Sequence, residues 1–498
     1  MTLQQLYVAL FIGGLVLLAS IAATRLATGV GLPSLLLFLG VGVLVGEDGL
    51  GLQFDNAQLA QDLGTAALAV ILVEGGLTTR FNDIRKVLAP AAVLATFGVA
   101  ASTVITAAAV HWVFGMNWQL ALLLGAVVSS TDAAAVFSVL RVVPLPRRLS
   151  GLLEAESGFN DAPAVILVLL FSAVPMDLDP LTIAGTMFYE LLMGVVLGLG
   201  FGFLGAMTLR RIALPAAGLY PLAAFGLCMV SFAAAGTAHA SGFLAAYLSG
   251  VVLANSGLPH RSATRSFAEG AGWLAQIGVF VILGLLVSPS ELLREVVPAI
   301  VAGLVLLLLA RPLSVFLSLV GFRVPWREKV FLSWAGLRGA VPIVLCTYPI
   351  VEGVPDSWRL LHIVFILVVL YTAIQGPSLR IVAEWLHLIP RDTTREIQVD
   401  AAPLDVLGAE LLTMTVLPGS RLHNVTVVEL RLPDPSVITL IIRAGQPFVP
   451  QPVTRLAIGD ELLIVTTSVT RELAERRLRA VSRRGKLAYW FDEYGDPN

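Results

Sequence analysis

The chain has 498 residues, of which 57% are hydrophobic and 13% are charged, and its mean hydropathy is +0.86. A soluble globular protein carries roughly 25% charged residues, so this composition predicts a polytopic membrane protein. The formal net charge of −2 provides no basic field that would attract nucleic acid. We therefore expect an all-α membrane protein whose partners include membrane lipid and no nucleic acid.

Thirteen apolar runs are candidates for transmembrane helices, since a helix needs about 20 apolar residues to span a bilayer. The second and ninth runs are the shortest. The thirteen runs cover residues 5–25, 31–47, 59–79, 86–113, 117–141, 150–174, 181–211, 217–238, 240–256, 265–288, 293–320, 327–350 and 357–389.

The charges between these runs alternate along the chain. Fourteen Arg and Lys residues lie in one set of alternate loops, and only Arg294 and Arg359 lie in the other. Cytoplasmic loops carry the excess of basic residues. The N-terminus is therefore predicted outside the cell and the C-terminus in the cytoplasm.

If runs 1–6 correspond to runs 8–13, the two halves begin on opposite faces of the membrane, because seven spans separate their starts. The odd number of runs therefore predicts two six-helix repeats of opposite orientation. Runs 6 and 13 start about 207 residues apart, and Asp132 and Arg338 are separated by a similar 206 residues. Inverted repeats of this kind are typical of transporters, in which the substrate site lies where two broken helices cross near the bilayer midplane.

Polar side chains interrupt the middle of the fifth run at Ser129-Ser130-Thr131-Asp132. A carboxylate at this depth costs at least about 2.5–3.5 kcal/mol on insertion scales, so it is a functional hypothesis by default. Ser, Thr and Asp side chains also compete with the helix for backbone hydrogen bonds. The pattern predicts a broken helix whose freed carbonyls suit a monovalent cation.

The sixth run carries two polar pairs. Ser157 and Asp161 share one helix face at i, i+4 spacing, and Glu156 and Asn160 share the adjacent face. Oxygen ligands without Cys or His favour Na⁺, K⁺ or H⁺ over a transition metal. One carboxylate that holds either a cation or a proton is sufficient for their exchange.

The twelfth run contains Gly336, Arg338, Gly339 and Pro342, which predict a second helix break. A buried arginine needs a partner, and the candidate is Glu156, which gives the pair a structural role. The alternative is an arginine that lines an anion path. In the third run, Glu74 either holds a water at the site or reaches the membrane interface by snorkelling.

The composition changes after Pro390. Residues 391–402 are expected to form a linker, 403–485 a small α+β cytoplasmic domain, and 486–498 a tail. Within this domain β-branched runs predict strands at residues 411–417, 437–443 and 461–467, and charged residues predict a solvated helix at 470–482. Residues 422–430 are expected to form a short helix or an extended stretch.

Three motifs together resemble the cation/proton antiporter-1 family, in particular the NhaP-type bacterial Na⁺/H⁺ and K⁺/H⁺ antiporters. The motifs are Ser130–Phe137, Glu156–Asp161 and Gly336–Ala340, and the resemblance covers roughly residues 5–389. It implies thirteen spans, a homodimer in the bacterial inner membrane, and an elevator-like motion of a core domain.

The same resemblance assigns roles to individual residues. Asp161 would bind the cation and the proton, supported by Asp132, Thr131 and Ser157, with Glu74 contributing through a water. The residues that would organise the core are Asn160, Glu156 and Arg338. An Asn-Asp pair at 160–161 resembles the electroneutral branch of the family.

Residues 403–485 resemble a TrkA C-terminal (RCK-C) domain at Pro418-Gly419-Ser420, Ile442–Gly445 and Ile458–Glu461. The resemblance implies gating by the cytoplasmic domain, with a nucleotide as candidate effector, and it favours K⁺ over Na⁺.

The sequence thus predicts a secondary antiporter that exchanges a monovalent cation for protons, without a cofactor and without enzymatic activity. No P-loop is present in the sequence, so a gradient is expected to drive the exchange. The alternatives are a gated monovalent cation channel and a cation-coupled symporter for a small solute.

Overall fold

A computed structural model describes residues 3–30, 34–52, 54–132, 143, 145–176, 179–389, 409–467 and 469–484. The chain divides into two compact units, Met1–Asp392 and Thr393–Asn498, and each is described by itself. The expected linker, residues 391–402, and the expected tail, residues 486–498, lie outside the described residues.

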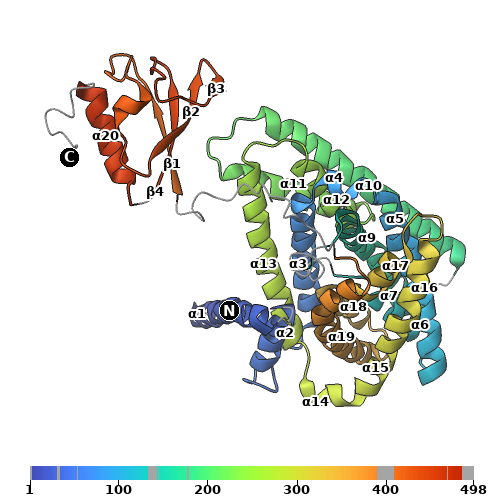
Figure 1. Cartoon of the computed structure of the whole chain (residues 1–498). Coiled ribbons are helices and arrows are strands. Elements are labelled where there is room, and N and C mark those ends of the chain that lie inside the picture. The colour runs from blue at the N-terminus through green and yellow to red at the C-terminus, as the bar shows by residue number, and fades with distance from the viewer. Residues whose placement is uncertain are drawn as a thin grey trace. The chain divides into compact units, whose positions relative to one another are not determined.

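The first unit is entirely helical in its described residues (Figure 1). Its principal helices are α1 (Leu3–Val30), α2 (Ser34–Val45), α3 (Ala57–Thr78), α4 (Phe81–Ile84), α5 (Leu88–Val93), α6 (Val99–Phe114), α7 (Trp118–Ser129), α9 (Arg147–Ser172), α10 (Pro180–Arg211), α11 (Leu219–Thr237), α12 (Gly242–Ala254), α13 (Arg261–Leu285), α14 (Pro289–Leu292), α15 (Val296–Val305), α16 (Arg311–Ser318), α17 (Trp326–Trp334), α18 (Ala340–Val351) and α19 (Ser357–Trp385).

Seven helical segments in the described part of the chain are long and apolar enough to cross a bilayer, and five shorter apolar helices accompany them. Helix α9 is continuous over 26 residues and keeps its helical course through Pro163. Every one of the thirteen predicted runs therefore contains helix, although several helices are shorter than the run that predicted them.

Both predicted helix breaks are present. Helix α7 ends at Ser129, and Ser130 adopts an extended backbone. Helix α17 ends at Trp334, and the chain resumes helical structure only at Ala340, where α18 begins. Residues 133–141, the second half of the fifth predicted span, lie outside the described residues.

Two further helices contain a π-helical turn that the sequence pattern did not predict. Leu94–Gly98 (η1) joins α5 to α6, and Leu306–Ala310 (η3) joins α15 to α16. The contacts of the two turns are reciprocal, because η1 packs on α16 and η3 packs on α6. Such turns widen a helix locally and are frequent at functional sites.

Helix α10 packs along α12 through glycines at four-residue spacing. A Cβ atom added at Gly194, Gly198 or Gly202 would come within 2.9 Å of Ser241, Ala245 or Val252 atoms. The sequence contains a GxGxxG pattern here, but it lies within a helix and serves close helix packing. Helix α3 in turn packs on both α12 and α13.

The second unit contains a four-stranded antiparallel sheet in the order β1-β4-β2-β3. The strands are β1 (Ala409–Thr415), β2 (Val437–Arg443), β3 (Gln446–Phe448) and β4 (Glu461–Thr467). Strands β2 and β4 have the predicted bounds, whereas the three-residue β3 was not predicted because it is too short to show alternation.

The remaining elements of this unit are a 3-10 helix, η5 (Val427–Leu430), and helix α20 (Arg471–Arg484). The core contains Ile441 and Leu462 from neighbouring strands and Leu478 and Val481 from α20. The predicted solvated helix thus buries one apolar stripe against the sheet.

Candidate functional site

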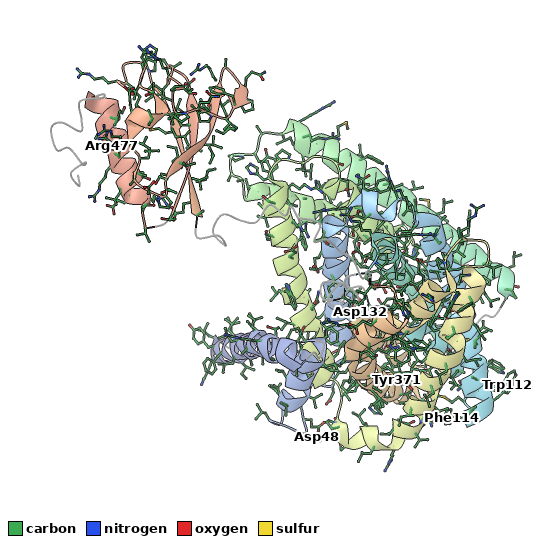
Figure 2. The ribbon with its side chains drawn as sticks, in the orientation of Figure 1. Asp48, Trp112, Phe114, Asp132, Tyr371 and Arg477 are labelled. Atoms are coloured by element: carbon green, nitrogen blue, oxygen red, sulfur yellow. The ribbon has the colours of Figure 1, made fainter. Side chains whose placement is uncertain are left out.

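The break after α7 meets the break between α17 and α18. The backbone N–H of Asp132 donates to the carbonyl of Leu337 at 2.9 Å. The backbone N–H of Ala340, the first residue of α18, donates to Asp132 Oδ2 at 3.0 Å. Figure 2 shows Asp132 among the helices of the first unit, whereas Asp48 and Trp112 lie at its edge. The two predicted helix breaks therefore meet in the described residues, at a crossing defined by these bonds of Asp132 to Leu337 and Ala340.

The crossing is too tight for a side chain at Gly339. A Cβ atom at this position would lie 1.5 Å from Asp132 Oδ2, and one at Gly336 would lie 2.5 Å from Arg338. Real Cβ atoms do not approach other heavy atoms so closely. Gly339 is therefore required for the close approach of Asp132 to the break before α18, whereas at Gly336 the atom in the way is the end of the flexible Arg338 side chain.

Helix α9 presents its polar face to the break of α7. The hydroxyl of Ser130 donates to Asp161 Oδ1 at 2.5 Å, and Ser157 Oγ donates to the carbonyl of Thr131 at 3.0 Å. Asn160 Nδ2 donates to Thr131 Oγ1 at 2.5 Å. The structure thus brings together Asp161, Ser157, Asn160 and Thr131, as the sequence predicts.

The site is buried. Asp161 is 4% exposed and Asp132 is 3% exposed, and the two carboxyl groups interact electrostatically. Carboxylate, hydroxyl and carbonyl oxygens are hard ligands that suit alkali cations and protons. The negative charge is concentrated where helix α18 directs its N-terminus, which carries a partial positive charge. This arrangement can hold one small cation or one proton against Asp161.

The predicted pairing of Glu156 with Arg338 is wrong. Glu156 Oε1 lies 2.6 Å from Nη1 of Arg311, and both side chains are at least 96% buried. Arg338 instead donates from Nε to the carbonyl of Val128 at 3.0 Å, and it also donates to the carbonyl of Gly336. Arg338 lies near Glu156, but its guanidinium satisfies the carbonyls that the two helix breaks leave open.

Arg338 therefore links the backbones of the two helix breaks through its side chain. The carbonyl of Arg338 also accepts a hydrogen bond of 2.6 Å from Thr372 Oγ1 on α19. These bonds connect the end of α7, the break before α18 and the middle of α19. The structural role that the sequence predicts for Arg338 fits this position, with backbone carbonyls as its partners.

Glu74 lies against α13. Its carboxylate packs on Gly272, where a Cβ atom would come within 2.1 Å of Oε2, and Gln276 Nε2 donates to the same oxygen at 3.5 Å. These described contacts join α3 to α13 and do not include Asp161. A contribution of Glu74 to ion binding through a water stays a prediction.

Sequence reasoning missed two residues of the site. Arg311 is a charged residue inside an apolar run, and the rule that identified Asp132 would have selected it as well. Ser130 was part of the motif but was not assigned a contact, because sequence spacing does not determine which hydroxyl of Ser129-Ser130 faces helix α9.

Comparison with known proteins identifies the family of the chain. Residues 15–385 match the family described as sodium/hydrogen exchanger, transmembrane, and residues 411–479 match the TrkA-C domain. The chain is 37% identical over 454 residues to the K(+)/H(+) antiporter NhaP of Alkalimonas amylolytica, with 89% of this chain and 78% of that protein covered. It is 35% identical over 494 residues to the K(+)/H(+) antiporter NhaP2 of Shewanella baltica, with 97% and 85% covered.

A solved structure has the same fold. The sodium proton antiporter MjNhaP1 from Methanocaldococcus jannaschii at pH 8 matches with a TM-score of 0.60 and 24% identity, over 77% of this chain and 96% of that chain. The Na(+)/H(+) antiporter ApNhaP of Aphanothece halophytica is 27% identical over 403 residues, with 76% of each chain covered. This chain therefore belongs to the sodium/hydrogen exchanger family of multi-pass membrane transporters and carries a TrkA-C domain.

Proposed function

We propose that this chain is a monovalent cation/proton antiporter and that Asp161 is the carboxylate that exchanges the two ions. The observation that carries the proposal is the contact of Asp161 with Ser130, at 2.5 Å, on the non-helical segment of a broken membrane helix. A cation and a proton that compete for one carboxylate cannot occupy it together. Each passage of the site across the membrane then carries one of the two ions.

The neighbouring residues support this exchange in different ways. Ser130 and Thr131 offer hydroxyl and carbonyl oxygens next to Asp161, and Ser157 orients the carbonyl of Thr131. Asp132 contributes negative charge and fixes the start of α18. Asn160, Glu156 and Arg338 hold the helices in place, and Glu74 contributes through a water.

We propose K⁺ as the physiological cation and an electroneutral exchange of one cation for one proton. The relatives at 35–37% identity are named K(+)/H(+) antiporters, whereas a relative at 27% identity is named a Na(+)/H(+) antiporter. Electroneutrality is supported by Asn160, which is neutral and bonded to Thr131 where a second carboxylate would add a charge to the site.

The proposed architecture has thirteen spans in two inverted repeats. The two helix breaks and the two π-helical turns support it, because one break and one such turn lie in the described residues of each half. The reciprocal packing of η1 on α16 and of η3 on α6 is the relationship that a pseudo-two-fold axis would produce. The N-terminus would lie outside the inner membrane and the C-terminus in the cytoplasm.

We further propose that a homodimer operates by an elevator-type motion and that the domain at 403–485 gates it. In this motion the helices around the site, including α7, α9 and α18, would move against α10 and α12. Tyr247 of α12 lies at this boundary, since its ring is 5.5 Å from the ring of Phe159 and packs on Gly158. Cross-linking introduced cysteines at positions 159 and 247 with a short bifunctional reagent should stop exchange.

The test of the proposed chemistry is Asp161→Asn in everted membrane vesicles that carry a ΔpH-sensitive dye. The wild type should dequench the dye when K⁺ is added, and Asp161→Asn should not, because an amide cannot exchange a proton for a cation. Asp62→Asn, which changes an exposed carboxylate on α3, is the control and should retain exchange. Cation-dependent dequenching by Asp161→Asn would overturn the assignment.

A second measurement separates an antiporter from a channel or a symporter. Proteoliposomes adsorbed to a solid-supported membrane report net charge movement directly. Electroneutral exchange should change the internal pH on addition of K⁺ without a current. A current that follows the K⁺ gradient in the absence of a pH change would favour the channel.

A further inference from the structure

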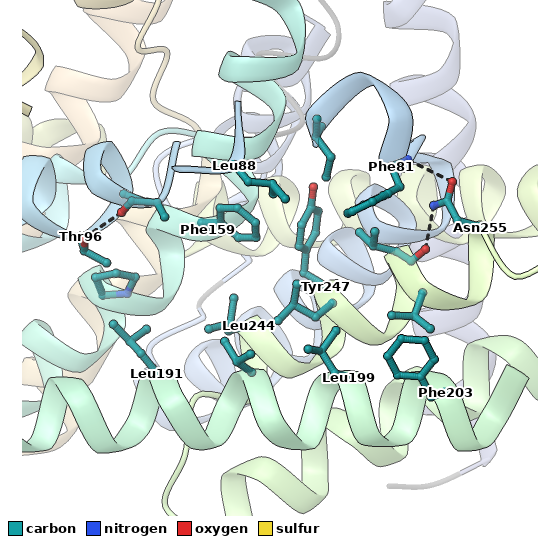
Figure 3. A pocket seen from close by; sticks show the side chains of 18 of the residues that line it. Phe81, Leu88, Thr96, Phe159, Leu191, Leu199, Phe203, Leu244, Tyr247 and Asn255 are labelled. Atoms are coloured by element: carbon teal, nitrogen blue, oxygen red, sulfur yellow. Dashed lines mark hydrogen bonds between the residues drawn. The ribbon is translucent and has the colours of Figure 1, made fainter. Parts of the chain in front are cut away.

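A cavity of about 630 Å³ is lined by the helix that carries Asp161 and by helices α10 and α12 (Figure 3). One wall is formed by α4, α5, η1 and α9, including Phe159 and Pro163. The other wall is formed by α10 and α12. The volume of the cavity lies within the range of about 300–1,000 Å³ that is typical of small-molecule sites. We propose that it binds one acyl chain of a phospholipid with an anionic headgroup at the cytoplasmic surface.

The shape of the cavity fits an extended alkyl chain. Leu191, Val195, Leu199 and Phe203 line it from one face of α10, at intervals of four residues. Twelve residues of α-helix rise about 18 Å, which is the length of a long acyl chain in extended form. Figure 3 shows Leu191, Leu199 and Phe203 in a row opposite Leu88 and Phe159.

The polar side chains that line the cavity already have partners within the protein. Thr96 Oγ1 donates to the carbonyl of Ala92 at 2.7 Å, and Ser256 Oγ donates to the carbonyl of Val252 at 2.5 Å. A buried water needs two to four polar partners, and cavities without them are dry and bind apolar ligands.

The remaining two polar side chains are engaged in the same way. Asn255 bonds the N–H of Phe81 and the carbonyl of Thr79, both at 3.0 Å, and the hydroxyl of Tyr247 lies 3.4 Å from that of Thr79. The cavity therefore favours a hydrocarbon over water or a polar solute.

One end of the cavity reaches the surface beside basic side chains. Phe81 and Phe203, at this end, are 45% and 62% exposed. The short segment of residues 80–86, which contains α4, carries three exposed basic residues, Arg80, Arg85 and Lys86. It carries one exposed acidic residue, Asp83. Basic residues near a membrane surface attract anionic lipid. These basic residues therefore favour an anionic headgroup at the open end of the apolar cavity.

Lipid binding at this cavity can be measured without measuring the proposed exchange reaction. The intact protein is purified, delipidated and titrated with dioleoyl phosphatidylglycerol or dioleoyl phosphatidylcholine, and bound lipid is counted by native mass spectrometry. Val195→Trp fills the cavity from α10. Val196→Trp is the matched control, because the adjacent Val196 is 52% exposed and does not line the cavity.

The wild type and Val196→Trp should retain one phosphatidylglycerol, and Val195→Trp should reduce that retention at least about tenfold, because the indole occupies the space of several methylene groups. Leu199→Phe repeats the test with a smaller addition if Val195→Trp does not fold. Equal phosphatidylglycerol retention by Val195→Trp and Val196→Trp would overturn the assignment of the lipid to this cavity.

The headgroup is tested with the double variant R85Q/K86Q. It should lower phosphatidylglycerol binding to the level of phosphatidylcholine and leave phosphatidylcholine binding unchanged. Equal affinity of the wild type for the two lipids would overturn the anionic part of the proposal. Binding of oleate or detergent at the same cavity with exclusion of both phospholipids would overturn the choice of occupant.

Discussion

The carboxylate of Asp132 accepts a hydrogen bond from the backbone N–H of Ala340, 208 residues later in the chain, at 3.0 Å. The bond places a negative side chain at the N-terminus of α18, where the helix dipole stabilises it. It also fixes the distance between the two helix breaks. The candidate site therefore depends on contacts between distant parts of the sequence, and the predictions below follow from individual contacts.

Gly339→Ala should destabilise the crossing. The added Cβ atom would lie 1.5 Å from Asp132 Oδ2, so the two half-helices must separate. Overpacking of a tight interior typically costs about 1–3 kcal/mol, and we expect a lower unfolding temperature together with loss of exchange. Both can be measured on detergent-solubilised and reconstituted protein. Gly226→Ala on α11 is the control, since no atom lies within 4 Å of its added Cβ.

Ser130→Ala should raise the apparent KM for the cation while Ser129→Ala leaves it nearly unchanged. Ser130 donates to Asp161, whereas Ser129 Oγ donates to the carbonyl of Ala126 in its own helix at 2.7 Å. A hydrogen bond to a charged group contributes about 1.5–3 kcal/mol, so the expected increase is at least about tenfold. Equal effects of the two substitutions in a K⁺ titration of dequenching would contradict the assignment.

Removal of one partner of the Glu156–Arg311 pair should be strongly destabilising. Both side chains are buried, and an unpaired buried charge typically costs about 3–5 kcal/mol. Glu156→Met and Arg311→Met should each lower the unfolding temperature, and the double variant should recover part of the loss. Thermal unfolding of the four proteins completes the double-mutant cycle.

The same cycle with Arg338→Met distinguishes the two arginines. Because the guanidinium of Arg338 bonds the carbonyl of Val128, its coupling to Glu156 should be weaker than that of Arg311. The exposed pair Arg265–Glu269 on α13 provides a baseline, and its coupling should be about 0.3–0.5 kcal/mol. A stronger coupling of Glu156 to Arg338 than to Arg311 would contradict the structure.

Asp460→Asn should loosen the sheet of the second unit. The buried carboxylate accepts two hydrogen bonds from Arg443, at 2.7 and 2.8 Å, and one from the N–H of Ala457 at 2.7 Å. The amide variant should accelerate hydrogen exchange of peptides that cover residues 455–467 in the full-length protein. Arg471→Gln, which breaks an exposed pair with Glu410, is the control and should have a small effect.

The same contact predicts a loss of stability in acid. Burial alone would raise the pKa of Asp460, but the hydrogen bonds from Arg443 and Ala457 outweigh it and hold the pKa below its usual value. A carboxylate with a lowered folded-state pKa contributes stability above its unfolded-state pKa, near 3.9, and this contribution is lost as the pH falls through the folded-state value. The protection of the same peptides, measured relative to the intrinsic exchange rate at each pH, should therefore fall below about pH 4, and Asp460→Asn should remove this acid dependence.

Much of the site was predictable because buried polar groups are conspicuous in an apolar sequence. The breaks at Ser130 and Gly339 followed from helix-breaking residues at mid-span, and the polar face of α9 followed from i, i+4 spacing. Contacts between individual residues of distant helices were harder to predict from the sequence. Glu156 could have paired with either of two arginines, and only the three-dimensional structure identifies Arg311 as its partner.

Other features left no signal in the sequence pattern. The π-helical turn at Leu94–Gly98 differs from an α-helix by one residue in its hydrogen bonds, and its apolar residues fit both forms. The cavity beside α10 arises from the distance between helices, which sequence periodicity does not encode. In contrast, strands β2 and β4 were predicted with their observed bounds because β-branched residues and turn residues mark both ends.

The bond between Asp132 and Ala340 also has a consequence for biosynthesis. A ribosome adds about 5–20 residues per second, so Asp132 is synthesised at least about ten seconds before Ala340. Until then the carboxylate and the open carbonyls of the first broken helix lack the partners that the finished protein provides. The insertion machinery or membrane water must satisfy them during this interval, and a nascent chain arrested before Leu337 is therefore expected to be a preferred substrate for membrane quality-control proteases.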